Sequence, residues 1–186
     1  MIKRIVVLMM SVGLCAPMAQ AGIVATGDVI PADPATWTTS TAAYIGKTGT
    51  GSVTVDDESD VVSRYSYLGY RSGSTSAATV SGVGSTWTDD GFLRVGHAGD
   101  GTLDITDGGA VSNTDGYIGR YSNSTGAVTV SGAGSTWTNS DYLYVGDEGN
   151  GTLDITNGGA VSNDDGSIGY YSGSTGVVTV SGVGST

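Results

Sequence analysis

The sequence predicts an all-β protein, a right-handed parallel β-helix (β-solenoid) of about six coils, with two coils in each 50-residue repeat. Trp37, Trp87 and Trp137 lie fifty residues apart, and residues 87–136 and 137–186 align without a gap and are identical at 35 of 50 positions. Each unit divides into two similar halves, and its short Val, Ile, Leu and Thr runs alternate as strands do. A period of this length is typical of a modular array.

The half-repeat sets the size of one coil. The longer half runs from Gly119 to Gly146 and the shorter from Gly146 to Gly169. A half therefore averages about 25 residues, within the range of periods that solenoids use. Mostly extended chain of that length has a contour of about 80 Å, which suits one turn of a three-sided coil. Residues 37–186 would give six coils and roughly 29 Å of axis, with Gly and Asn-Gly or Asp-Gly pairs at the corners.

Alternation assigns each strand residue to a face. Leu143, Val145, Leu153 and Ile155 point inward, whereas Tyr142, Tyr144, Thr152, Asp154 and Thr156 point outward. Ile168, Val178 and Val180 take the inner positions of the other half; the equivalents in the preceding unit are Leu93, Val95, Leu103, Ile105, Ile118, Val128 and Val130. We expect the tryptophans to pack at the wider corner of the longer half.

Antiparallel meanders are the competing architecture, because four-stranded propeller blades also repeat at about this length. Strand pairing separates the two. Contacts between residues one half-repeat apart indicate a solenoid, and hairpin contacts indicate blades.

The two ends differ from the array. Residues 1–21 read as a signal peptide, with Lys3 and Arg4 before the apolar run 5–14 and Ala19-Gln20-Ala21 as the cleavage site. Residues 22–36 form an N-terminal entry or cap segment that shields the first coil edge. The repeats follow at 37–86, 87–136 and 137–186. The sequence stops at Thr186, directly before the position where the frame demands the next tryptophan, so we expect the array to continue beyond this fragment.

Composition narrows the class of partner. Without residues 1–21 the chain has five basic and 18 acidic residues, a net charge of −13, and no cysteine. This charge argues against nucleic acid and anionic membrane surfaces as partners. No segment of the mature chain is long and apolar enough to span a membrane as a helix. The pattern is typical of a secreted or cell-surface protein.

The repeat resembles a known family. Gly-Thr-Leu-Asp-Ile-Thr-Asn-Gly-Gly (151–159), Tyr-Ile-Gly-Arg-Tyr-Ser-Asn-Ser-Thr-Gly (117–126) and Val-Thr-Val-Ser-Gly-Ala-Gly-Ser-Thr-Trp-Thr-Asn (128–139) are similar to the repeats of autotransporter passenger regions and PEP-CTERM-associated surface proteins of Gram-negative bacteria. The resemblance implies a Sec-exported β-helix that acts as a stalk, adhesin-like surface or matrix component, without catalytic residues. It also implies an outer-membrane β-barrel or a sorting anchor in a C-terminal region beyond this fragment.

Polar positions give no catalytic, cofactor or metal site. The counterparts of His97 in neighbouring units are Lys47 and Asp147, which indicates a solvated turn. Asp104 and Asp154 share one outward position, but two coils separate them by about 10 Å, too far to share one ion. The acidic residues at 56–60 could bind a cation, but an irregular early coil explains this cluster equally well.

Tyrosines form the candidate binding surface. Exposed aromatics beside Asn and Asp suit carbohydrate or protein contacts, while stacking that stiffens the coil corners is the competing interpretation. The candidate residues are Tyr121, Tyr142, Tyr144, Tyr170 and Tyr171.

The leading functional hypothesis is a non-enzymatic scaffold that contacts a polysaccharide or a surface protein. The alternative is a polysaccharide-binding or polysaccharide-degrading β-helix protein, because catalytic β-helices use clustered carboxylates in a groove.

Overall fold

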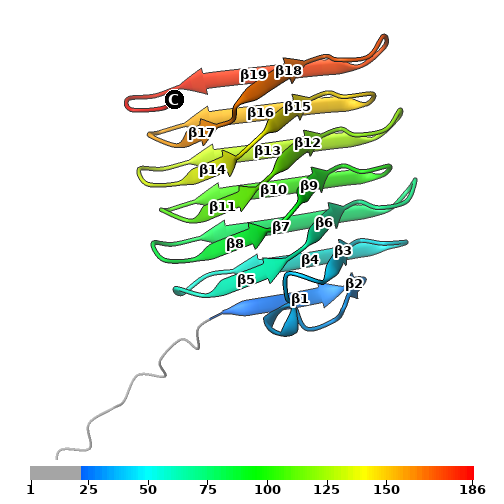
Figure 1. The fold of residues 1–186 in the computed structure, drawn as a ribbon, viewed down its shortest axis with the longest axis vertical. Helices are drawn as coiled ribbons and strands as arrows, with labels where there is room; N and C mark the ends of the chain where they lie inside the picture. The colour runs from blue at the N-terminus through cyan, green and yellow to red at the C-terminus, as the bar shows by residue number, and fades with distance from the viewer. Residues whose placement is uncertain (1–21) are drawn as a thin grey trace, which may run out of the picture.

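The computed structural model describes residues 22–186, in which the chain winds into a stack of coils (Figure 1). The predicted signal peptide lies outside the described residues. Each coil except the last contributes one strand to each of three sheets, here named A, B and C, and the last coil contributes strands to A and B; the coils rise along one axis from the N-terminal to the C-terminal end. The stack is a parallel β-solenoid of about six turns, as predicted, and each coil is three-sided.

Three sheets run along the stack. Sheet A contains β1 (Ile23–Gly27), β4 (Thr50–Val55), β7 (Thr75–Ser81), β10 (Asp100–Thr106), β13 (Thr125–Ser131), β16 (Asn150–Thr156) and β19 (Thr175–Ser181). Sheet B contains β2 (Val29–Ile30), β3 (Ala42–Ile45), β6 (Tyr65–Leu68), β9 (Phe92–Val95), β12 (Asp115–Ile118), β15 (Tyr142–Val145) and β18 (Asp165–Ile168). Sheet C contains β5 (Asp60–Ser63), β8 (Thr86–Asp89), β11 (Ala110–Asn113), β14 (Thr136–Asn139) and β17 (Ala160–Ser162).

Strand pairing confirms the solenoid against the meander. Leu103 pairs with Val128 and Val128 with Leu153, so successive sheet A partners are parallel and exactly half a repeat apart. In sheet B the steps alternate between shorter and longer, because Leu93 pairs with Gly116 and Gly116 with Leu143. The sheet C step also alternates, because Trp87 pairs with Val111 and Val111 with Trp137, so the links on both sides of sheet B vary in length from coil to coil while sheet A keeps a constant register.

The first coil has two antiparallel strands at its lower edge. β1 pairs with β4 and β2 pairs with β3, both antiparallel. A 3₁₀ helix, η1 (Pro34–Thr36), follows β2, and Trp37 after it donates its indole N–H to the carbonyl of Pro31 at 3.0 Å. Residues 22–36 thus occupy the edge strand positions that β3 and β4 would otherwise leave unpaired.

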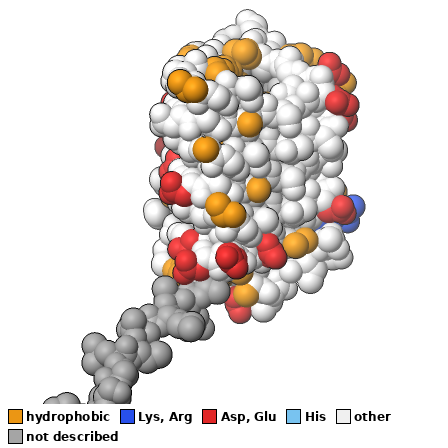
Figure 2. Space-filling model, turned by 90° about the vertical axis from the view of Figure 1, so that its left-hand side faces the viewer, with side chains coloured by type: hydrophobic (Ala, Val, Ile, Leu, Met, Phe, Trp, Pro, Cys, Tyr) orange, Lys and Arg blue, Asp and Glu red, His pale blue; other side chains and the backbone are white. Residues whose placement is uncertain are grey.

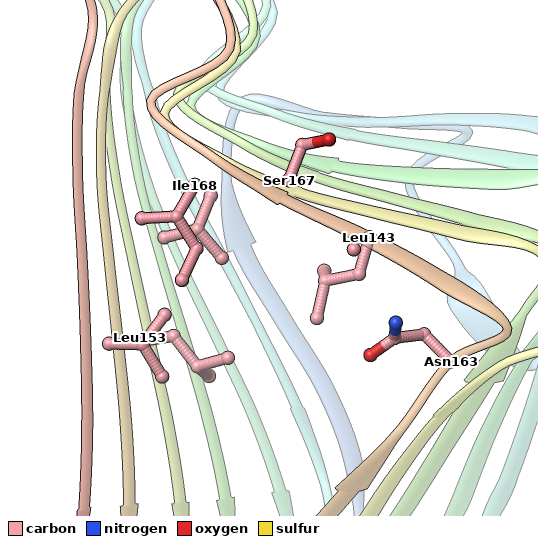
Figure 3. Close-up of a pocket in the computed structure, with 8 residues that line it drawn as sticks. Leu143, Leu153, Asn163, Ser167 and Ile168 are labelled. Atoms are coloured by element: carbon pink, nitrogen blue, oxygen red, sulfur yellow. The ribbon is translucent and has the colours of Figure 1, made fainter.

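Aliphatic side chains fill the interior, as alternation predicted. Leu93, Leu103, Ile105, Ile118, Val128 and Val130 are at most 1 % exposed. The inner positions of the last coil differ, since Ile168 and Val180 are 60 % and 54 % exposed. β18 and β19 are the last strands of their sheets, so no coil covers these side chains, and Figure 3 shows Ile168 beside Leu153 and Leu143 at this end.

Two of the three tryptophans, Trp87 and Trp137, lie in strands, so their predicted place at a corner is wrong, whereas Trp37 directly follows η1. Trp87 and Trp137 are the second residues of β8 and β14 and are fully buried. In sheet C the inner column runs Val61, Trp87, Val111, Trp137, Val161 from coil to coil. A valine on each side leaves room for each indole, because interiors pack to crystal-like density.

A second inner column, at the ends of the sheet C strands, is polar. The Trp137 indole N–H donates to Asn113 Oδ1 at 2.7 Å, and Asn113 Nδ2 donates to Asn139 Oδ1 at 2.6 Å. At the same position of β8, Asp89 accepts hydrogen bonds from the hydroxyls of Ser63 and Ser66. Complete burial raises the pKa of Asp89 to about 7, although these hydrogen bonds act in the opposite direction.

Candidate aromatic and basic binding face

One side of the solenoid collects nearly all of the aromatic and basic side chains. All ten tyrosines, the sole phenylalanine, the sole histidine and all five basic residues of 22–186 lie on sheet B strands or in the turns that flank them. We call this surface the aromatic face. Its members are Tyr44, Lys47, Arg64, Tyr65, Tyr67, Tyr70, Arg71, Phe92, Arg94, His97, Tyr117, Arg120, Tyr121, Tyr142, Tyr144, Tyr170 and Tyr171.

Other surfaces are different. Figure 2 shows the side of the stack at the left of Figure 1, where uncharged polar and backbone atoms dominate and acidic and small apolar side chains are scattered. The acidic residues are distributed around the stack, whereas the bases are not.

The centre of the aromatic face is one outward column of sheet B, which we call the strand column. Its register is Tyr44, Tyr67, Arg94, Tyr117, Tyr144, one residue from each successive coil. Tyr44 and Tyr67 stack with centroids 5.0 Å apart and planes 5° apart; Tyr117 and Tyr144 stack at 5.1 Å and 5°. The spacing between paired strands, about 4.8 Å, is close to the separation that stacked rings adopt, so the backbone sets this geometry.

Beside it runs the turn column, formed by the residue after each strand-ending glycine. These glycines need positive φ; at Gly119 φ is 71° and a Cβ would lie 2.3 Å from the Asn150 carbonyl oxygen. The tight turn places the next side chain against the strand column. The turn column consists of Lys47, Tyr70, His97, Arg120, Asp147 and Tyr170.

His97 occupies this column as a buried ring, so the predicted solvated turn is wrong. It is 7 % exposed, stacks on Tyr70 with centroids 4.9 Å apart, and meets Tyr67 and Tyr121 edge to face. Burial, and then the charges of Arg94 and Arg120, lower its pKa to about 4. The imidazole is therefore neutral at pH 7 and packs as an aromatic group.

Asp147, the His97 counterpart one unit later, is also buried, at 3 % exposed, and pairs with Arg120. Burial raises the pKa of Asp147 above its ordinary value, although Arg120 acts in the opposite direction. Lys47, the earlier counterpart, lies with Nζ 4.3 Å from the Tyr44 ring centroid. Lys47, His97 and Asp147 thus occupy equivalent positions of the turn column, and each contacts a different kind of neighbouring side chain.

The five predicted binding tyrosines lie on this face, and four of them form one contact chain. Tyr144 stacks near Tyr142 and meets Tyr170 edge to face, and Tyr170 meets Tyr171 at 4.8 Å. Tyr121 lies apart from them and contacts the Arg120 guanidinium at 4.8 Å. Tyr170 and Tyr171 are 55 % and 53 % exposed, so the rings contact one another and also present surface, while binding by them stays a prediction.

An open hollow of about 140 Å³ lies among these residues. Tyr117, Arg120, Tyr144, Asp147, Tyr170 and Tyr171 line it. It combines aromatic walls with one ion pair.

Sequence reasoning missed half of the face. Arg94, Phe92 and Tyr117 were not connected with the candidate tyrosines, because the sheet B step is alternately shorter and longer and a constant half-repeat frame misaligns them. Aligning the short strands by the glycine that follows each one would have placed them in one column.

Other candidate features do not assemble into a site. Asp104 and Asp154 lie on sheet A with Thr129 between them in the register, as expected from their spacing. Across residues 22–186, no group of three or more His, Cys, Asp or Glu side chains is arranged to hold a metal ion. Two further hollows lie at the uncovered end of the core, near Leu143, and along Thr88, Ser112 and Thr138.

No family model, curated protein or solved structure matches the chain. Within the described range, none of the helical structure reaches the length and hydrophobicity needed to cross a bilayer.

Proposed function

We propose that this chain is a non-enzymatic repeat scaffold of a secreted or cell-surface protein, and that its aromatic face binds a polysaccharide or a surface protein. The observation that carries the proposal is the segregation of every tyrosine and every basic residue of 22–186 to one side of a uniform rod. Folding needs the inner positions filled, but it does not require outer aromatics to gather on one sheet. Tyr and Arg are the residues that binding surfaces favour.

A solenoid with constant pairing suits a scaffold, because each coil is hydrogen-bonded to the next along its length. In sheet A every residue of β10 pairs with β13, and every residue of β13 pairs with β16. The resemblance to autotransporter passengers and PEP-CTERM-associated proteins supports the same role, as a stalk, adhesin-like surface or matrix component.

Polysaccharide degradation is the second candidate function. The observation that favours it is the hollow beside Tyr144, where Asp147 and Arg120 lie at the foot of aromatic walls. Glycoside hydrolysis by the usual route needs two carboxyl groups flanking the bond. A reducing-end assay on neutral and acidic glycans tests it, and turnover lost in Asp147→Asn would favour this function over scaffolding.

Binding by the aromatic face is tested with immobilised glycans and extracellular-matrix proteins. We expect weak, multivalent retention of the chain that the double variant Tyr170→Ser/Tyr171→Ser reduces about tenfold or more, because both rings are exposed and neither fills the core. Val177→Thr is the matched control, since Val177 is 47 % exposed on sheet A. Absence of retention on every surface would leave a spacer role and overturn the proposed binding.

A further inference from the structure

Arg94 interrupts the strand column. Each of the remaining coils from β3 to β15 supplies a tyrosine at this position. Its guanidinium carbon lies 4.0 Å from the Phe92 centroid, 5.2 Å from that of Tyr117 and 5.7 Å from that of Tyr67. A planar guanidinium stacks on rings as a tyrosine would, but it directs its N–H donors outward in its own plane. The position therefore keeps the stacking and adds a directed positive charge.

This charge has no acidic partner. The ion pairs of residues 22–186 join Arg120 to Asp147 and, at 3.5 Å, to Glu148, and neither involves Arg94. Arg94 Nε is buried without a hydrogen-bond partner. A half-buried cation that lacks a counter-charge costs free energy of folding, which an anionic ligand would recover.

Two neighbours add unpartnered nitrogens beside Arg94: Arg120 as a second cation and His97 as a neutral ring. His97 is more than nine-tenths buried, and its Nδ1 has no hydrogen-bond partner; Arg120 Nε has none either. Arg94 and Arg120 are close enough for each to influence the His97 ring, and Arg120 also influences Arg94. Three unsatisfied nitrogens on two adjacent coils thus surround one place on the aromatic face. Asp147 and Glu148 in the next coil pair with Arg120, and Asp147 also lies within electrostatic range of Arg94.

We propose that Arg94 binds the anionic group of an acidic polysaccharide, a uronate carboxylate or a sulfate ester, while the tyrosines on either side contact the sugar rings. This inference rests on the proposed binding function and names its ligand class. Carboxylate and sulfate both match the planar donor fork of a guanidinium. The exposed rings continue along the axis toward Tyr170, which suits a polymer better than a single small anion.

The negative net charge of the chain does not prevent an acidic polysaccharide from binding at Arg94. At physiological ionic strength screening reduces the repulsion from charges more than about 8 Å away, and all five bases of residues 22–186 lie on this face. Arg94 therefore has a second base, Arg120, within electrostatic range on the same face.

The test compares polymers that differ only in charge. Binding of the chain to polygalacturonate and to its methyl ester, and to dextran sulfate and dextran, is measured at low and at high salt. We expect both anionic polymers to bind at least tenfold more tightly than their neutral partners, with salt reducing the difference. Preference for only one anionic polymer would identify carboxylate or sulfate as the group that is bound.

The variants isolate Arg94. Arg94→Tyr restores the tyrosine of the strand column and should fold, yet it should lose the preference for anionic polymers about tenfold or more. Arg71→Gln removes the same charge from an exposed turn of the same face and should keep most of the preference. Circular dichroism of both variants establishes that the coils remain formed.

Equal binding of the anionic and neutral polymers would overturn this inference and leave the proposed function intact. Failure of every polymer to bind, together with failure on matrix proteins, would overturn both. Equal binding of polyglutamate and polygalacturonate would overturn the assignment to a polysaccharide. An Arg94→Tyr variant that keeps the full preference would remove Arg94 from the site.

Discussion

The outer faces of sheets A and B are built on the same coils, yet they carry different chemistry. Sheet A presents hydroxyls and carboxylates, and its neighbouring coils join through short links such as Thr106 to Ser81 at 3.1 Å and Thr156 to Ser131 at 2.9 Å. Sheet B presents stacked rings and bases. Both sheets bury aliphatic residues at alternate positions. Inner positions therefore specify the fold, while outer positions are free to specify contacts.

The largest expected effect is a loss of stability when a side chain is removed from the interior that sheets A and B share. Trp137→Ala empties a fully buried site between Val111 and Val161 and orphans the Asn113 amide oxygen. We expect a loss of about 3–5 kcal/mol in the free energy of unfolding, measured by denaturant titration. Val83→Thr, at a turn residue 79 % exposed, is the control and should change stability by less than about 0.5 kcal/mol. A small effect of Trp137→Ala would mean that the coils do not unfold cooperatively.

Asp89 tests whether the shared interior responds to pH. Its folded-state pKa is about 7 against an ordinary 3.8, so the native state holds a proton that the unfolded state has lost. The contribution of Asp89 to stability should therefore fall as pH rises from about 4 to about 7, by at most about 4 kcal/mol, and stay constant above that range; a His97→Tyr background shows it alone. Asp89→Asn, the residue found at positions 113 and 139, should abolish this falling slope. A falling slope that survives in the variant would assign it to another group.

His97 should contribute a slope of the opposite sign over a narrower pH range because its pKa shift is smaller, so the two contributions largely cancel in the wild type between about pH 4 and 6.5. Its folded-state pKa is about 4 against an ordinary 6.5, so protonation favours the unfolded state between these values. In the Asp89→Asn variant, where the opposing contribution is absent, stability should rise as pH increases from about 4 to about 6.5. His97→Tyr, which copies Tyr70 of the preceding coil, should leave the Asp89 slope alone, and NMR titration of the wild-type imidazole should show no protonation near pH 6. Protonation at pH 6.5 would mean that the ring is solvated.

The smallest pair of effects contrasts the two outer faces directly. Tyr144→Ser copies Ser167 of the next coil and removes stacking with Tyr117, which should cost about 1 kcal/mol and weaken ligand binding. Asp154→Thr copies Thr179 of the next coil on sheet A and should leave both stability and binding nearly unchanged. Equal binding losses in the two variants would end the distinction between the faces.

Much of the fold was readable from the sequence, because the inner positions repeat with little change. Leu103, Val128 and Leu153 share one register position, and a periodic aliphatic pattern predicts such a column directly. The tryptophans were misplaced because we expected a bulky ring to need a corner. Pairing each ring with valines above and below makes a strand position possible, and that pairing is visible only across coils.

The aromatic face was only partly predictable. Exposed tyrosines such as Tyr142 were identified from alternation, but His97 was expected in solvent because its counterparts are Lys47 and Asp147. Polar identity is a poor guide to burial where a turn residue lies against neighbouring rings, since Lys47 stacks, His97 packs and Asp147 forms an ion pair. The residue at this turn position differs in chemical type from repeat to repeat, but in each repeat it contacts a neighbouring side chain of the aromatic face.

The alternation of valine and tryptophan in sheet C also constrains how such a gene can change in length. Deleting one coil would make two indoles, or two valines, direct neighbours in the column and would change the volume that the interior has to accommodate. Deleting or duplicating one whole repeat preserves every neighbour in the column and alters the rod by roughly 10 Å. Unequal recombination between repeats should therefore yield viable proteins in steps of two coils, and each added step would bring its own share of the aromatic face.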